Sequence, residues 1–242
     1  MRQKETFAEQ IIKFYSSLSN VSIDLPDKYK LINPFNGNDK AIVQEVVKQF
    51  YYKFYNDNKK RKMILGSSPA RRGTAVTGVP FEDAWHIKEI TGIDIENFYI
   101  SKASSNFLYD VMDSYGGCEK FYNDFYMNFV CPLGITRINE QGNEVNCNYC
   151  ENKKLKEALI DLIVKSIKEQ IQFGIDTRVC YCIGSGENYD FLTKINNEYH
   201  FFDSIVPLEH PRFIMQYNSH RKDEFLKKYL DILTLDVSVK GE

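Results

Sequence analysis

The sequence predicts an α/β fold, built as one three-layer α/β/α domain around a central four-stranded parallel sheet. Four short apolar runs, each ending in turn-forming or small residues, are candidate strands. Helical patterns separate the later runs, and strands that alternate with helices are typical of parallel sheets. The 242 residues contain no internal repeat, low-complexity segment or linker. We therefore expect a single domain over residues 1–242.

The N-terminal part is predicted to be a helical extension over about residues 1–58. Apolar residues at helical spacing predict an amphipathic helix over Thr6–Leu18. The turn-rich stretch NPFNGND, at 33–39, separates it from a second helical pattern over Ala41–Asn56. The basic KKRK at 59–62 then leads into the first strand.

The remaining elements follow in order along the chain. The predicted strands cover residues 63–65, 125–130, 178–183 and 204–208. Helical patterns cover 155–173, which Gly174 closes, then 189–195 and 221–233.

Composition narrows the class of protein. A formal net charge of −2 argues against a protein whose whole surface binds nucleic acid, but it allows a local basic groove. The 17 Phe and 16 Tyr supply rings that can stack on planar ligands. No secretory or membrane-spanning segment is recognisable, so we expect a cytoplasmic protein with no membrane partner. The six cysteines are expected to be reduced, mostly as core thiols.

Three segments lie where predicted strands end. The first, GSSPARRGTAVTGVPF at 66–81, is rich in small residues that expose backbone N–H groups. The second, FYMNFVCPLG, covers 125–134, and the third, EHPRFIMQY, covers 209–217. Because open α/β folds bind ligands at the carboxyl ends of their strands, these segments predict a site.

These three segments resemble the active-site motifs of the uracil-DNA glycosylase superfamily, especially the branch related to single-strand-selective monofunctional uracil-DNA glycosylase. Gly66, Pro69, Gly73 and the run 77–81 match the first motif in register, and His210 with Pro211 opens the second. The resemblance covers about residues 60–217. The resemblance implies the fold of the uracil-DNA glycosylases and the activity of a monofunctional glycosylase in base excision repair. Such an enzyme flips uracil or a related deaminated base out of DNA, needs no metal or other cofactor, and is expected to be a monomer.

The resemblance implies three catalytic candidates. His210 would donate a hydrogen bond to the base O2 and stabilise the departing anion, whereas the alternative is a structural His-Pro turn. The best-known members hold the attacking water with Asn or Asp at the position of Ser68. A serine hydroxyl has a shorter reach, so Ser68 and Asp83 are both candidates for this role. The alternative for Asp83 is a solvated surface carboxylate.

The resemblance also implies a base pocket. Backbone N–H groups near Ser67 would add donors to the base oxygen, and Phe81 would stack on the flipped ring. Asn128 offers one donor and one acceptor, which match uracil O4 and N3–H. Ala70 replaces a glycine near the C5 edge of the base, so we expect thymine to be rejected. The alternatives are an Asn that caps a strand and a core Phe.

The expected DNA contacts lie around this pocket. We expect Arg71 and Arg72 to meet phosphates, with surface ion pairs as the alternative. Apolar residues after His210, in a rim loop, would fill the gap left by the flipped base, or would pack under the last helix. The candidate rim and phosphate contacts are Arg212, Phe213, Met215, Arg221 and Lys222.

Two other functions are weighed against the glycosylase. The first is a catalytically weak DNA-binding or damage-sensing protein that retains the base pocket, suggested by Ser68 and Ala70. The second is a small-molecule enzyme that binds phosphate, but the chain lacks a Walker lysine and a Gly-x-Gly-x-x-Gly at the strand end. Cys147-x-x-Cys150 resembles part of a metal site. Relatives that hold a four-cysteine cluster place two ligands ahead of the first motif, where this chain has none.

Overall fold

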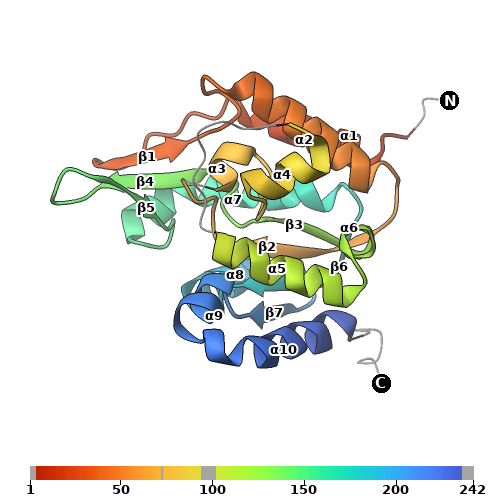
Figure 1. Cartoon of the computed structure of the whole chain (residues 1–242). Helices are drawn as coiled ribbons and strands as arrows, with labels where there is room; N and C mark the ends of the chain where they lie inside the picture. Colours follow the sequence, from red (N-terminus) through yellow and green to blue (C-terminus); the bar gives the residue numbers. More distant parts are fainter. Residues whose placement is uncertain (1–3, 72, 94–101, 236–242) are drawn as a thin grey trace.

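The computed structural model describes residues 4–71, 73–93 and 102–235. Its main sheet has four parallel strands in the order β3-β2-β6-β7 (Figure 1). These strands are β2 (Arg61–Gly66), β3 (Phe125–Phe129), β6 (Ile175–Ile183) and β7 (Ile205–Leu208). Each of the four predicted apolar runs forms one of these strands, so the predicted fold class is confirmed.

Helices cover both faces of the sheet. Phe125 of β3 packs against Tyr115 of α5 and Phe121 of α6. The next residue, Tyr126, faces the opposite side and donates a hydrogen bond to Gln170 of α7. In Figure 1, α5 lies in front of the stacked strands, α1, α2 and α4 lie above β3, and α10 lies below β7. No helix of the described segments is long and apolar enough to cross a membrane. The helices are α1 (Phe7–Leu18), α2 (Lys40–Tyr55), α3 (Thr74–Thr77), α4 (Ala84–Thr91), α5 (Lys102–Tyr115), α6 (Cys118–Asp124), α7 (Lys153–Ile171), α8 (Glu187–Tyr199), α9 (Pro211–Tyr217) and α10 (Lys222–Thr234), with a 3₁₀ turn at Ser219–Arg221.

A buried arginine joins the N-terminal helices to the sheet. Arg61, at the start of β2, is 1% exposed and donates to both carboxylate oxygens of Asp57, at 2.8 and 3.0 Å. Its guanidinium also lies over the rings of Phe7 and Tyr55, 5.0 and 4.7 Å from their centroids. Because a buried charge must be paired, these contacts fix where α1 and α2 meet β2.

A second, antiparallel sheet lies outside the sequence prediction. It has the order β1-β4-β5, with β1 at Tyr29–Ile32, β4 at Gly134–Ile138 and β5 at Glu144–Cys147. These strands have four or five residues each and carry many polar side chains, so no apolar run marks them. Figure 1 shows the sheet projecting from the end of the molecule where α3 and α9 lie.

The prediction of a rim loop after His210 is wrong, because residues 211–217 form helix α9. His210 is the N-cap of this helix and Pro211 stands in its first turn, where a missing N–H costs nothing. Ile214 is buried, so one face of the short helix belongs to the core.

The loop after β2 depends on a glycine. Gly78 ends α3 with a φ of +74°, and a Cβ there would lie 2.6 Å from Val43 Cγ1 and 3.0 Å from Val47 Cγ2. Both the backbone conformation and the close packing against α2 therefore exclude a side chain.

Gly78→Ala is expected to lower the free energy of unfolding by about 2–4 kcal/mol, because left-handed strain adds to overpacking. Gly142→Ala is the matched control, since Gly142 also has positive φ (+78°) but nothing within 4 Å of its Cβ position. We expect the control to lose about 1 kcal/mol. Urea unfolding of both variants measures the difference, and equal losses would contradict the packing argument.

Candidate functional site

Backbone hydrogen bonds join the segments that follow β2 and β3. Val130 N–H donates to the carbonyl of Gly66 at 2.8 Å, and Cys131 N–H donates to the carbonyl of Ser67 at 2.9 Å. The pairing of the two parallel strands thus continues past their carboxyl ends. The segments 66–81 and 125–134 therefore lie side by side.

Two aromatic rings stack beside Gly66. Phe81 and Phe129 have centroids 4.8 Å apart and planes at 29°. A Cβ at Gly66 would lie 2.6 Å from Phe81 Cζ and 3.0 Å from Phe129 Cδ1. Phe81 has a φ of +64°, and its N–H donates to Thr74 Oγ1 at 3.1 Å. This bond closes the loop and sets the ring of Phe81 at the end of the sheet.

The second sheet supports the other side of the loop. Gly134, at the start of β4, has its Cβ position 2.9 Å from the carbonyl oxygen of Pro69. Arg71 N–H donates to Asn146 Oδ1, on β5, at 2.8 Å. The structure therefore gives Arg71 a backbone anchor, whereas Arg72 lies outside the described residues.

A small pocket of about 10 Å³ separates the first motif from β3. This volume holds about one water molecule and no base. Its walls come from the first motif, from β3 and its following loop, and from the N-terminal part of the chain. The lining residues are Tyr15, Pro34, Phe35, Pro69, Thr74, Gly78, Pro80, Asn128, Phe129 and Pro132.

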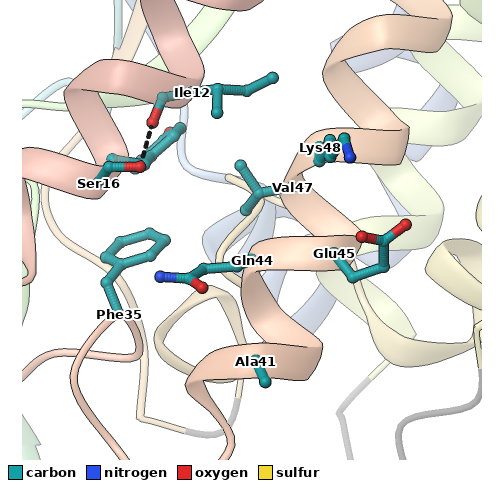
Figure 2. Close-up of a pocket in the computed structure, with 9 residues that line it drawn as sticks. Ile12, Ser16, Phe35, Ala41, Gln44, Glu45, Val47 and Lys48 are labelled. Atoms are coloured by element: carbon teal, nitrogen blue, oxygen red, sulfur yellow. Dashed lines mark hydrogen bonds between the residues drawn. The ribbon is translucent and has the colours of Figure 1, made fainter.

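A wider groove of about 370 Å³ lies between α1 and α2 (Figure 2). Ile12 and Val47 form part of its wall, and the Gln44 amide extends toward the ring of Phe35. Tyr15 and Phe35 line both this groove and the small pocket. No sequence motif marked either residue, because Tyr15 fits the apolar face of α1 as a core residue and Phe35 stands in the turn-rich stretch before α2.

His210 is held in one tautomer. Its Nδ1 accepts the backbone N–H of Arg212 at 3.0 Å, as the N-cap of α9. In the neutral imidazole the proton therefore resides on Nε2, which is left as a donor. Burial, and then the charge of Arg212, lower the pKa of His210 below its ordinary value. His210 is therefore a neutral side chain near physiological pH, with its Nε2–H as the hydrogen-bond donor.

Ser67 and Ser68 are both partly buried at the end of β2. In the described part of the chain, no acceptor pairs with the backbone N–H of either serine, and the Ser68 hydroxyl has no hydrogen-bond partner. Ala70 is exposed and its carbonyl accepts the N–H groups of Gly73 and Ala75, at 3.0 and 3.2 Å. The loop thus turns tightly after the two serines.

Asp83 does not lie where a water-positioning acid is needed. It is 2% exposed and caps α4, with Oδ1 accepting His86 N–H at 2.9 Å. Its Oδ2 contacts His86 Nδ1 at 2.9 Å and accepts from Ser105 Oγ at 2.5 Å. Burial alone would raise the pKa of Asp83, yet these hydrogen bonds outweigh it and hold the pKa below its ordinary range. This geometry supports neither the catalytic role nor a solvated surface carboxylate.

Asn128 lines the small pocket, as expected of a base-reading residue, but its amide is engaged from behind. Its Nδ2 lies within hydrogen-bond distance of Gln170, Tyr126 and Tyr15, and the residue is 1% exposed. The prediction that both amide groups match a base is therefore not supported by this conformation. Gln170, which no sequence motif marked, holds this amide.

Helix α9 presents its aromatic residues to solvent. Phe213 is 47% exposed and Tyr217 is 67% exposed, whereas Met215 is only partly buried. Arg212 Nε donates to Gln216 Oε1, one turn along the helix, at 3.0 Å. An exposed aromatic face therefore begins directly after His210.

The two basic residues at the start of α10 have acidic partners. Arg221 pairs with Glu224 at 2.8 Å, and Lys222 pairs with Asp110, on α5, at 2.6 Å. In this conformation both side chains form surface ion pairs, which a DNA phosphate would have to replace.

The six cysteines are free thiols. Burial raises the pKa of Cys131 and of Cys147 to about 12, so neither forms a thiolate near neutral pH. Within the described ranges, no group of three His, Cys, Asp or Glu side chains is arranged to hold a metal ion.

Comparisons with known proteins agree on one family. A sequence model of the uracil DNA glycosylase superfamily matches residues 52–234. The crystal structure of wild-type SMUG2 from Pedobacter heparinus matches with a TM-score of 0.88 and 40% sequence identity, covering 95% of this chain and 97% of that one. No curated protein matches the chain.

A buried acid beside Asp83 makes stability depend on pH. Burial raises the pKa of Glu82 from 4.5 to about 7, although the hydroxyls of Tyr109 and Tyr122 each donate to it at 2.5 Å. The folded state therefore keeps a proton that the unfolded chain releases near pH 4.5. The stabilisation that this proton gives the folded state is therefore complete below pH 4.5. It declines as the pH rises to about 7, and stability does not change further with this group above that pH.

Glu82→Gln is expected to remove roughly 3 kcal/mol of this decline between pH 4.5 and 7, because the amide does not titrate. Urea unfolding at several pH values, compared with wild type, measures the change in slope. Glu89→Gln, an exposed change on the following helix α4, is the control. Parallel stability curves for wild type and Glu82→Gln would contradict the assignment.

Proposed function

Because the chain belongs to the uracil-DNA glycosylase superfamily, we propose that it hydrolyses the N-glycosidic bond of uracil, or of a related deaminated base, in DNA. The product is an abasic site for base excision repair. The observation that carries this proposal is the neutral, Nε2-protonated His210 at the carboxyl edge of the sheet. Such a donor is suited to an oxygen that becomes negative as the base departs.

Each step is assigned to a group at this edge. The target nucleotide is flipped out of the stack and its base lies against Phe81, which requires the small pocket to open. His210 Nε2–H, with the backbone N–H groups of Ser67 and Ser68, stabilises the base anion. The Ser68 hydroxyl orients the attacking water, since Asp83 is committed to α4.

The proposed reaction is monofunctional. The three motifs place no lysine as a nucleophile for the sugar, so a covalent imine and strand cleavage are not expected. The methyl group of Ala70 is proposed to exclude thymine at the C5 edge. The exposed Phe213 on α9 is proposed to fill the space that the flipped base leaves in DNA.

A DNA-binding damage sensor is the second candidate function. Two observations favour it: Ser68 stands where better-known members carry Asn or Asp, and the pocket of about 10 Å³ is closed. A sensor would bind uracil-containing DNA without releasing the base. Base release separates the two candidates.

His210→Ala is expected to lower the rate of uracil release by about 10²- to 10³-fold, because one aligned donor to the leaving anion is lost. The assay measures free base and abasic sites from single- and double-stranded oligonucleotides. His200→Asn is the control, since asparagine tolerates the left-handed conformation of His200 at the end of α8.

Uracil release that His210→Ala leaves intact would contradict the proposed role of His210. If wild type binds uracil-containing DNA and releases no base, the sensor is the better account.

A further inference from the structure

The Asn128 side chain lies between the small pocket and a buried polar network. Its Nδ2 is 2.6 Å from Gln170 Oε1, 2.7 Å from the Tyr126 hydroxyl and 3.1 Å from the Tyr15 hydroxyl. Asn128 and Tyr126 share one face of β3, Gln170 comes from α7, and Tyr15 comes from α1. Helices far apart in sequence thus meet behind a single pocket residue.

Two anchors together favour one orientation of this amide. Gln170 Nε2 donates to the carbonyl of Ser166 at 3.1 Å, and a carbonyl only accepts. Gln170 must therefore turn Oε1 toward Asn128, which in turn must present Nδ2. At the other end, the backbone N–H of Phe129, which only donates, binds Asn128 Oδ1 at 2.8 Å. Both anchors demand the same orientation.

The hydrogen-bonding capacity of Asn128 then leaves one choice. The two hydrogens of Nδ2 are taken by the nearest acceptors, Gln170 Oε1 and the Tyr126 hydroxyl. The Tyr126 hydroxyl in turn donates a hydrogen bond to Gln170 Oε1, at 3.0 Å. Only Oδ1 keeps a free lone pair, so the amide can offer a ligand an acceptor and no donor.

The network does not titrate near neutral pH. Burial raises the pKa of Tyr15, Tyr51 and Tyr126 well above the ordinary value of tyrosine. Their hydroxyls stay protonated, and Tyr15 is bonded to Tyr51 at 3.2 Å. Gln170 is fully buried, so its amide is out of contact with bulk water.

We propose that Gln170, with Tyr126, is a positioning residue that turns only Oδ1 of Asn128 toward the base. The site then selects bases with a ring N–H at the edge that faces Asn128. Uracil N3–H supplies such a donor, whereas cytosine N3 is an acceptor and would face the Oδ1 lone pair. This inference rests on the proposed function and gives it a means of sparing normal cytosine.

The test compares Gln170→Leu, Gln170→Glu and the control Gln172→Leu, an exposed glutamine at the end of the same helix. One readout is the affinity for single-stranded oligonucleotides with 2′-fluoro-uridine or 2′-fluoro-cytidine, whose glycosidic bonds resist cleavage. The other is kcat and KM for uracil release. Tyr126→Phe provides a milder variant that frees one hydrogen of Nδ2, in case Gln170→Leu does not fold.

Gln170→Leu is expected to reduce the preference for uridine over cytidine by about tenfold, because the amide then keeps only the Phe129 N–H as its anchor and turns its NH₂ toward the pocket more readily. Gln170→Glu should keep the preference, since a carboxyl oxygen still accepts from Asn128, and Gln172→Leu should match wild type. Tyr126→Phe should show a smaller loss in the same direction.

Folded Gln170→Leu or Tyr126→Phe with unchanged preference would overturn the positioning role, even if kcat falls, because a merely structural residue lowers activity without altering selection. Wild type that releases uracil while these variants keep their preference would contradict this inference alone. Wild type that releases no base and binds both oligonucleotides equally would contradict the proposed function as well.

Discussion

The site depends on the close approach of two aromatic rings to Gly66, at the carboxyl end of β2. Any Cβ at this position would lie 2.6 Å from Phe81 Cζ, so only glycine lets the rings of Phe81 and Phe129 stack beside the strand. The carbonyl of Gly66 also accepts the N–H of Val130. The same residue therefore joins the loops after β2 and β3 and leaves room for Phe129, which lines the small pocket, to stack on Phe81.

The parallel strand order then brings the remaining chemistry to that edge. His210 follows β7, and its ring is fixed by the cap of α9 at one side. On the other side, Tyr229, on α10, donates a hydrogen bond to the carbonyl of Glu209, the residue before His210. The orientation and protonation of the imidazole are thus properties of backbone geometry. Rigid elements, rather than long loops, hold the proposed donors.

The sequence predicts those parts of the fold that local patterns encode. The four buried strands appear as apolar runs, and the glycines and prolines of the first motif mark the loop that needs them. Tyr15 and Gln170 could not be found in this way, because their shared partner Asn128 lies 113 and 42 residues away from them along the chain. Asp83 was misread for a similar reason: a carboxylate after Phe81 looks available until Ser105 and His86 are placed around it.

The most direct test of the account is a crystal structure of His210→Ala bound to a single-stranded oligonucleotide that contains uracil. The account predicts an intact nucleotide flipped into an opened pocket, with its base against Phe81 and its N3–H on Asn128 Oδ1. A base bound in the groove between α1 and α2, or a nucleotide left in its stack while the pocket stays closed, would contradict it.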